Sequence, residues 1–383
     1  MALAAVSLWA QGGPPGATIN DFHVVDGVTR WIYVATDSGV YRSRDDGSTW
    51  QAFNDGLPWT EFETTAVTGV TNQLFVSLDG DGVYRWQNEG PWVKTSNGIT
   101  DLEVFSLAAK PGDPTFVLAG TYSKGVFRST DGGDSWTRLT GLPVVGSFTD
   151  IAFAPNDTQR ILALSNPAQL YESRDGGGSW TPRAGSQSVT LRGVTFDPSN
   201  PDRAYVASSI GIFRQDGPGQ NLAGLPATER YDFTDVAVDP SNSNVLYLAD
   251  RYGVLVSTDQ GGTYTRAAGL PQAGGFSLEA LPGETTRVLA GAYGSGVFVS
   301  DDMGATYQPS SIGLNGANVF SIAVDPNMPG VAYASTDGGE VYKTVNNGDS
   351  RREARGGLAQ FRSRALMVDP ADSNRVYSGS INR

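Results

Sequence analysis

The segment STDGGDSW at residues 129–136 decides how this sequence folds. Four other segments share its pattern, Ser-x-Asp-x-Gly-x-(Ser/Thr)-aromatic: SRDDGSTW, SRDGGGSW, STDQGGTY and SDDMGATY, which begin at residues 43, 173, 257 and 300. Degenerate copies begin at residues 86, 215 and 344, so successive copies are 42 to 44 residues apart. Self-similarity at a fixed period of this length indicates a repeat architecture.

Each copy lies inside a longer repeated unit. A strand-like segment such as Gly125–Arg128 precedes the copy, and Gly-Leu-Pro or a related tripeptide follows it, as at Gly141–Pro143. Two further apolar segments, the first often ending in Asp-Pro, complete the unit. Each unit therefore predicts four short strands with turn residues between them. Radial packing buries the faces of such small sheets against one another, which gives a β-propeller.

The predicted fold is all-β: a propeller of four-stranded antiparallel blades with eight complete repeats of about 43 residues and a partial ninth. We expect one domain over residues 1–383, with a possible closing strand at 1–16, eight repeats at 17–361 and the partial ninth repeat at 362–383. Three arrangements of the ends stay open. The termini could close a three-stranded ninth blade, the array could stop within a blade, or an eight-bladed ring could carry a terminal hairpin packed elsewhere.

Composition excludes several classes of function. The net charge of -13 argues against a nucleic-acid partner, because an acidic surface repels phosphate. The sequence has no cysteine and a single histidine, His23, so we expect no disulfide, no metal site and no cofactor. We expect His23 to pack or to line a channel rather than to act in catalysis. The apolar segment at residues 2–10 is far too short to span a membrane.

The repeated aspartates have a structural interpretation. A short carboxylate can accept hydrogen bonds from the backbone of its own turn, and the aromatic residue that follows can insert between sheets. An active site would not be copied into every repeat. We therefore assign a structural role to ten turn residues: Asp45, Trp50, Asp131, Trp136, Asp175, Trp180, Asp259, Tyr264, Asp302 and Tyr307.

These repeats resemble the Asp-box (BNR) repeats of sialidases, sortilin-type receptors, tandem-propeller xyloglucanases and Ycf48-type assembly factors. The resemblance implies the fold but not one function, since these families share only a scaffold. It also implies that ligands bind the face opposite the repeated turns. That face would carry the ligand-binding candidates Trp59, Tyr122, Arg230, Tyr231, Arg251, Tyr252 and Tyr293. It would also carry Asp37, Asp79, Asp81, Asp337, Glu61, Asp101, Arg192, Glu229 and Arg362.

The leading functional hypothesis is a non-catalytic scaffold that binds a protein or a glycan through this face, outside the cell or in the periplasm. The alternative is a xyloglucanase-like glycoside hydrolase, which needs two carboxylates; Asp37 and Asp337 lie in similar Thr-Asp turns. A sialidase is disfavoured because the Phe-Arg-Ile-Pro motif of that family is absent, and nothing in the sequence places Arg192, Arg230 and Arg251 together.

Overall fold

The computed structural model describes residues 18–25, 30–37, 39–58, 64–70, 72–144, 146–167, 169–183, 189–226, 228, 231–271, 276–281, 287–310, 319–324, 331–336, 341–345, 351–353, 363–369 and 372–380. These residues form antiparallel β-strands joined by short turns. In the part of the chain described, no helix is long and apolar enough to cross a membrane. The predicted closing strand at residues 1–16 lies outside the described residues.

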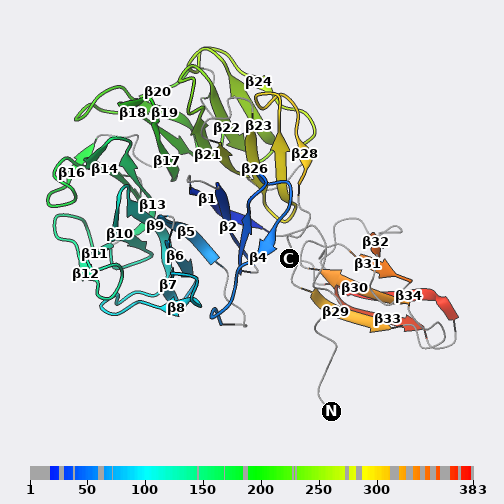
Figure 1. The fold of residues 1–383 in the computed structure, drawn as a ribbon. Coiled ribbons are helices and arrows are strands. Elements are labelled where there is room, and N and C mark those ends of the chain that lie inside the picture. Colours follow the sequence, from blue (N-terminus) through cyan, green and yellow to red (C-terminus); the bar gives the residue numbers. More distant parts are fainter. Residues whose placement is uncertain are drawn as a thin grey trace.

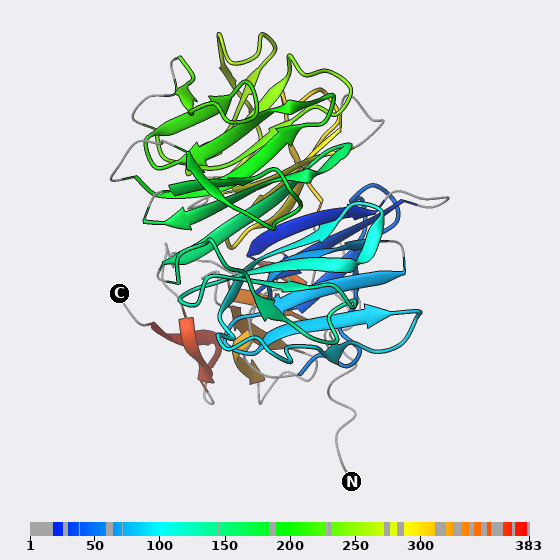
Figure 2. The same cartoon turned by 90° about the vertical axis from the view of Figure 1, so that its left-hand side faces the viewer.

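Seven four-stranded sheets, called blades 1 to 7 in chain order, form a ring (Figures 1 and 2). Blade 1 has β1 (Ile19–Val25), β2 (Trp31–Thr36), β3 (Gly39–Ser43) and β4 (Gln51–Ala52); blade 2 has β5 (Thr64–Val70), β6 (Gln73–Leu78), β7 (Gly82–Gln87) and β8 (Val93–Lys94). Blade 3 has β9 (Val104–Lys110), β10 (Asp113–Thr121), β11 (Val126–Ser129) and β12 (Thr137–Arg138); blade 4 has β13 (Ser147–Ala154), β14 (Asp157–Asn166), β15 (Gln169–Ser173) and β16 (Thr181–Arg183). Blade 5 has β17 (Leu191–Asp197), β18 (Asn200–Ser208), β19 (Gly211–Gln215) and β20 (Ala223–Gly224). Blade 6 has β21 (Phe233–Val238), β22 (Leu246–Asp250), β23 (Gly253–Ser257) and β24 (Thr265–Arg266); blade 7 has β25 (Phe276–Ala280), β26 (Val288–Ala292), β27 (Gly296–Ser300) and β28 (Gln308–Pro309).

The first strand of each blade is the innermost, and the fourth is short and lies at the rim (Figure 1). Each innermost strand contacts that of the next blade, from β1 to β25, and β25 contacts β1. The ring is therefore closed. Each of its blades is built from four strands consecutive in the chain, so closure involves no exchanged strand among those the structure describes.

The prediction of eight blades with a partial ninth is wrong, because the ring closes after seven. The eighth repeat forms a separate sheet of β29 (Val319–Val324), β30 (Ala332–Thr336), β31 (Val341–Thr344) and β32 (Arg351–Glu353). The last repeat forms a two-stranded sheet of β33 (Ser363–Asp369) and β34 (Asp372–Ser380). These two sheets pack together through β29 and β33 and lie outside the ring (Figure 1).

The joint between blades 7 and 1, called the seam, repeats the contacts of the internal joints. Apolar side chains of blade 1, such as Ile32 and Trp50, share one buried cluster with Leu289 and Val297 of blade 7. The indole N–H of Trp50 donates to the carbonyl oxygen of Ser310 at 2.9 Å. The period of the sequence gives the number of repeats. The angle at which neighbouring blades pack determines how many blades close the ring, and the sequence alone did not predict this angle.

The five repeated turns share one hydrogen-bond pattern. In blade 3 the Oδ1 atom of Asp131 accepts the backbone N–H of Ser135 at 2.9 Å and the hydroxyl of Ser129 at 2.7 Å. The Ser129 hydroxyl in turn accepts the N–H of Gly133 at 2.8 Å. The Ser135 hydroxyl also donates to Asp131, and this bond has the largest effect on the carboxylate. Together the hydrogen bonds lower the pKa of Asp131 to about 2. Corresponding bonds form around Asp45, Asp175, Asp259 and Asp302.

At the joints of blades 2 and 3 and of blades 6 and 7, the glycine after the turn has two reasons for its identity. Gly98 of blade 2 has φ of +97°, in the left-handed region that side chains resist. A Cβ there would lie 2.1 Å from the carbonyl oxygen of Trp136 in blade 3. Gly269 of blade 6 has the same relation to Tyr307 of blade 7, also at 2.1 Å. At these two joints the glycine thus lets one blade approach the aromatic residue of the next, whereas a Cβ on Gly141 of blade 3 would meet nothing closer than 3.8 Å.

Candidate functional site

The antiparallel order of the strands divides the turns between two faces of the ring. The turns between first and second strands, and the repeated turns between third and fourth strands, lie on one side, called the turn face. The turns between second and third strands, together with the connections between blades, lie on the other side, called the loop face. The predicted ligand-binding residues that the structure describes belong to the loop face: Tyr122, Tyr231, Arg251, Tyr252 and Tyr293.

Large exposed apolar and aromatic side chains gather in loop-face segments. Four predicted candidates are about half exposed: Tyr122 (52%), Tyr231 (50%), Tyr252 (57%) and Tyr293 (55%). Three of them lie in turns between second and third strands, in blades 3, 6 and 7, and Tyr231 lies in the connection that leads into blade 6. Exposed tyrosine rings offer flat surfaces for stacking, with a hydroxyl at the edge for hydrogen bonds.

The structure brings two of the predicted arginines onto one carboxylate. Arg192 of β17 donates through Nε and Nη2 to the two oxygens of Asp232, each at 3.0 Å. Arg251 of blade 6 donates to Oδ2 of the same Asp232 at 3.2 Å. Arg230, the third arginine considered in the sequence, lies outside the described residues. A single aspartate beside Tyr231 therefore holds two cations on the loop face.

A second ion pair lies close to Tyr252 in sequence. Asp250, which ends β22, is 1% exposed and accepts two hydrogen bonds from Arg266, at 3.0 and 2.6 Å. Its Oδ1 atom also accepts the backbone N–H of Tyr252 at 2.7 Å. The hydrogen bonds to Asp250 raise the pKa of Arg266. This carboxylate fixes the turn that presents Arg251 and Tyr252.

Sequence reasoning missed Asp232, Asp250 and Arg266. For Asp250 a signal was available, because the second strands of blades 1, 3 and 5 end in a hydroxyl residue. In blades 1 and 5 that hydroxyl donates to the carbonyl of Gly39 or Gly211, each at 2.8 Å. An aspartate at this position marks blade 6 as different. Asp232 lies outside the repeated pattern, so no comparison of repeats points to it.

The turn that carries Asp37 is anchored to two blades. The backbone N–H of Asp37 donates to the carbonyl oxygen of Thr18 at 3.2 Å. The neighbouring N–H of Thr36 donates to the hydroxyl of Thr64, in blade 2, at 2.7 Å. The Thr64 hydroxyl in turn donates to the carbonyl oxygen of Thr36 at 2.5 Å. Asp37 is half-buried on this fixed turn of the loop face.

Two other predicted acidic residues have local roles. Asp101 accepts the backbone N–H and the hydroxyl of Ser123, at 2.6 and 2.9 Å, and so joins two loops of blade 3. Asp81 accepts the hydroxyl of Tyr84 at 2.6 Å and pairs with Lys94. Asp79 is exposed at the tip of its turn. The loop-face candidates that lie outside the described residues are Trp59, Glu61, Glu229, Asp337 and Arg362.

Three aspartates near the start of innermost strands connect neighbouring blades. Burial raises the pKa of Asp150 to about 6 and that of Asp235 to about 7. Burial also raises the pKa of Asp21 well above its ordinary value, and repulsion from Asp150 and Asp235 adds to this. Each carboxylate accepts a backbone N–H of the next innermost strand: that of Val67, Val194 or Leu278, at 2.8, 2.7 and 2.8 Å.

His23 also connects innermost strands. Its Nε2 atom lies 2.9 Å from the carbonyl oxygen of Gly69 in blade 2. Burial lowers the pKa of His23, so the neutral ring is favoured. Among the residues that the structure describes, no group of three or more His, Cys, Asp or Glu side chains could hold a metal ion.

Comparison with known proteins adds two enzymes of related sequence. No family model matches the chain. It is 30% identical over 125 residues to an oligoxyloglucan-reducing end-specific xyloglucanase of Emericella nidulans, a match that covers 29% of this chain and 15% of that protein. It is 25% identical over 222 residues to a xyloglucanase of Hypocrea jecorina, covering 52% of this chain and 25% of that protein. These matches span a quarter or less of the curated relatives.

Solved structures support the fold. A GH74 enzyme of Niastella koreensis superposes with a TM-score of 0.70 at 18% identity, over 97% of this chain and 71% of that one. A YCF48 protein bound to a D1 peptide superposes with a TM-score of 0.60 at 19% identity, over 76% of this chain and 95% of that one. At these identities the likeness establishes a β-propeller fold and leaves the function to other arguments.

Proposed function

We propose that this chain is part of a xyloglucanase-like glycoside hydrolase and that its ring binds a polysaccharide across the loop face. The observation that carries the proposal is the placement of the four half-exposed tyrosines in loop-face segments, together with sequence similarity to two xyloglucanases. Glucan chains present flat apolar sugar faces and hydroxyl edges. Tyrosine rings with neighbouring charged side chains suit both features.

Arg251 and Tyr252 form the best-defined part of this binding surface. The Arg251 side chain is 55% exposed although it pairs with Asp232. Tyr252 follows it in the turn that Asp250 and Arg266 hold in place. A ring and a guanidinium fixed in this way lose little conformational freedom when a sugar binds, which favours affinity.

Asp37 is the carboxylate that we propose takes part in hydrolysis. Hydrolysis of a glycosidic bond uses one carboxyl group as acid and a second as base or nucleophile. The backbone N–H of Asp37 donates to Thr18, and the backbone of Thr36 exchanges hydrogen bonds with the Thr64 hydroxyl, so the chain is fixed at Asp37 and at the residue before it, as a catalytic position requires. Asp337 stays a proposal for the second carboxylate. We also propose that the repeated turns are Asp-box turns and that the protein acts outside the cell or in the periplasm.

A hydrolysis assay tests this proposal. Purified protein is incubated with xyloglucan, and the reducing ends released are measured for wild type and Asp37→Asn. We expect turnover in the wild type and a loss of at least about a hundredfold in the variant, because a positioned acid or base contributes on the order of 10²–10⁴. Glucan binding without turnover in the wild type would leave a glycan-binding module.

The second candidate function is a scaffold that binds a protein. The specific observation in its favour is that both loop-face arginines near Tyr231 already pair with Asp232, as in a structural or protein-recognition surface. A propeller of similar fold has been solved with a bound peptide. Absence of both glucan binding and turnover would favour this candidate.

A further inference from the structure

Neighbouring blades meet on the turn face through different side chains at different joints. Between blades 2 and 3, Arg85 of β7 reaches across to the repeated turn of blade 3. Its Nη1 atom donates to the carbonyl oxygen of Gly132 at 2.6 Å and to Oδ1 of Asp134 at 2.8 Å. Gln73 of β6 donates to the same carbonyl at 3.2 Å. An arginine of the chain itself therefore completes this joint.

The seam has the same backbone arrangement but lacks this pair. Val299 precedes the repeated turn of blade 7 as Arg85 precedes the turn of blade 2, so the two positions are equivalent. Ser48 is the sixth residue of its turn, as Asp134 is of the turn in blade 3. Both members of the Arg85–Asp134 pair are thus replaced by small side chains at the seam.

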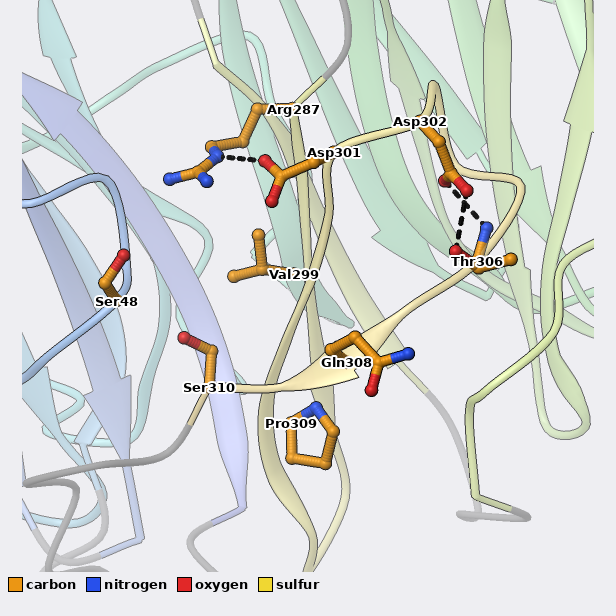
Figure 3. A pocket seen from close by; sticks show the side chains of 9 residues that line it. All are labelled: Ser48, Arg287, Val299, Asp301, Asp302, Thr306, Gln308, Pro309 and Ser310. Carbon is orange, nitrogen blue, oxygen red and sulfur yellow. Dashed lines mark hydrogen bonds and ion pairs between the residues drawn. The ribbon is translucent and has the colours of Figure 1, made fainter.

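A cavity of about 330 Å³ lies at the seam. Figure 3 shows the ion pair of Arg287 and Asp301 at one end and Asp302 with Thr306 at another, with Val299 between the ion pair and Ser310. Arg287 is equivalent to Gln73, and its Nη1 atom likewise donates to a carbonyl oxygen of the next turn, that of Asp46, at 3.1 Å. This cavity, called the seam pocket, therefore has a donor equivalent to Gln73 but none equivalent to Arg85.

The joint between blades 6 and 7 explains why a valine alone does not open such a pocket. Val256 there is equivalent to Val299, but its strand partner is Tyr247, whereas the partner of Val299 is Leu289. A Cβ placed on Gly304 of blade 7 would come within 2.9 Å of both Tyr247 and Val256. A Cβ on the equivalent Gly47 at the seam would also lie 2.9 Å from Leu289, but it would lie 3.6 Å from Val299, so the valine is farther from the turn at the seam than at the joint of blades 6 and 7.

The charges that line the seam pocket favour a cation. The lining carries two carboxylates, Asp301 and Asp302, and one guanidinium, that of Arg287. Asp302 is bonded within its own turn, whereas Asp301 pairs with Arg287 and its side chain is 67% exposed. The chain as a whole carries a net charge of -13, which attracts basic molecules over longer distances. Carboxylates and carbonyl oxygens are the acceptors that a guanidinium uses best.

We propose that the seam pocket binds the guanidinium group of an arginine side chain presented by a partner protein. The guest takes the place that Arg85 occupies at the joint of blades 2 and 3. It shares the carbonyl oxygen of Asp46 with Arg287, as Arg85 shares that of Gly132 with Gln73, and it donates to the exposed carboxylate of Asp301 beside Arg287. Its aliphatic stem packs on Val299. The site lies on the turn face and does not depend on the function of the loop face.

The probe for this site is N-acetyl-arginine amide, and the matched control compound is N-acetyl-citrulline amide, which has the same shape without the charge. Saturation-transfer difference NMR detects weak binding of such small probes to the full chain. We expect the arginine compound to bind at least about tenfold more tightly than the citrulline compound, and its binding to weaken as salt is added. Equal signals from the two compounds would overturn the proposal.

Two protein variants locate the binding. The double variant Ser48→Asp/Val299→Arg rebuilds the internal pair at the seam and should abolish the arginine signal while keeping the fold, which thermal unfolding verifies. Asp301→Asn removes an exposed charge without filling the pocket and should weaken binding about tenfold. An arginine signal that survives in Asp301→Asn and in the folded double variant would place the binding elsewhere and contradict the proposal.

Discussion

The indole N–H of Trp50 and the carbonyl oxygen of Ser310, 260 residues apart in sequence, form a hydrogen bond of 2.9 Å across the seam. The same bond joins Trp92 to Phe53 at 2.7 Å and Trp136 to Thr95 at 2.6 Å, at the internal joints of blades 1 to 3. The seam is therefore one more copy of the repeated joint. A ring that closes on its own repeat contact needs no exchanged strand to hold its ends together.

Loss of this bond should weaken the ring. Trp50→Phe leaves the buried carbonyl of Ser310 without its donor, and we expect a loss of about 1–3 kcal/mol in the free energy of unfolding. Trp180→Phe is the matched control, because no described residue accepts a hydrogen bond from the Trp180 indole. Chemical denaturation of both variants gives the comparison. Equal losses would mean that the smaller volume of the phenylalanine side chain, and not the lost hydrogen bond, determines the change in the free energy of unfolding.

Two glycines that both have a positive φ should differ in their tolerance of alanine. Gly98→Ala combines an unfavourable positive φ with a Cβ placed 2.1 Å from Trp136. Gly80 also has a positive φ, +73°, but nothing lies within 4 Å of its Cβ position. We expect Gly80→Ala to cost about 1–2 kcal/mol from backbone strain and Gly98→Ala to cost clearly more. Similar melting temperatures for the two variants would contradict the role assigned to Gly98.

The joint of blades 4 and 5 depends on a buried ion network. Arg160 and Glu172 are each 1% exposed, and Arg160 donates to Glu172 at 2.9 Å and to Gln215 of the degenerate turn at 2.7 Å. Arg160→Met leaves Glu172 with less compensation, so we expect a loss of about 3–5 kcal/mol. Asp301→Asn breaks an ion pair whose carboxylate is 67% exposed and should cost about 0–1 kcal/mol in the same urea titration. Arg160→Met/Glu172→Met should recover part of the loss; a double variant no more stable than Arg160→Met would contradict this account.

Because of the buried aspartates on the innermost strands, we expect the folded protein to be more stable in mild acid than at neutral pH. The folded pKa values of Asp150 and Asp235, about 6 and about 7, lie above the ordinary value of 3.8. Between these limits the unfolded chain loses protons that the folded chain keeps, so stability falls as pH rises from about 4 to about 7. Thermal unfolding across this range measures the slope. Asp235→Asn should flatten it, and an unchanged slope in that variant would contradict the assignment.

At lower pH the repeated turns should act in the opposite direction. Asp131 and Asp175 have pKa values of about 2, below the ordinary 3.8, because neighbouring hydroxyl and backbone groups donate to their carboxylates. Their contribution is present above about pH 4 and is lost as pH falls toward 2. The melting temperature should therefore pass through a maximum in mild acid. A steady rise of the melting temperature down to pH 2 would rule out this role for the turns.

The sequence predicted the blade but not the ring. The spacing of the turns around Asp131 and Asp175 gave four-stranded repeats, because turn chemistry and strand periodicity are local properties. The number of blades depends on the angle at which packed sheets meet, which no local pattern encodes. The tyrosines at 122, 231, 252 and 293 were predicted as loop residues and are exposed. The clustering of Arg192 and Arg251 on Asp232 joins segments 40 and 19 residues apart, and it needed the folded ring to bring them together.

The central claim, glucan binding on the loop face, is tested most directly by isothermal titration of xyloglucan oligosaccharides into the wild type, Tyr252→Ala and Val93→Ala. Val93 is 55% exposed, much like Tyr252, but lies in the rim strand β8. We predict binding by the wild type, binding weaker by a factor of about 2–10 in Tyr252→Ala from the lost stacking contact, and no change in Val93→Ala. Absence of binding in the wild type, or equal binding by all three proteins, would contradict the account.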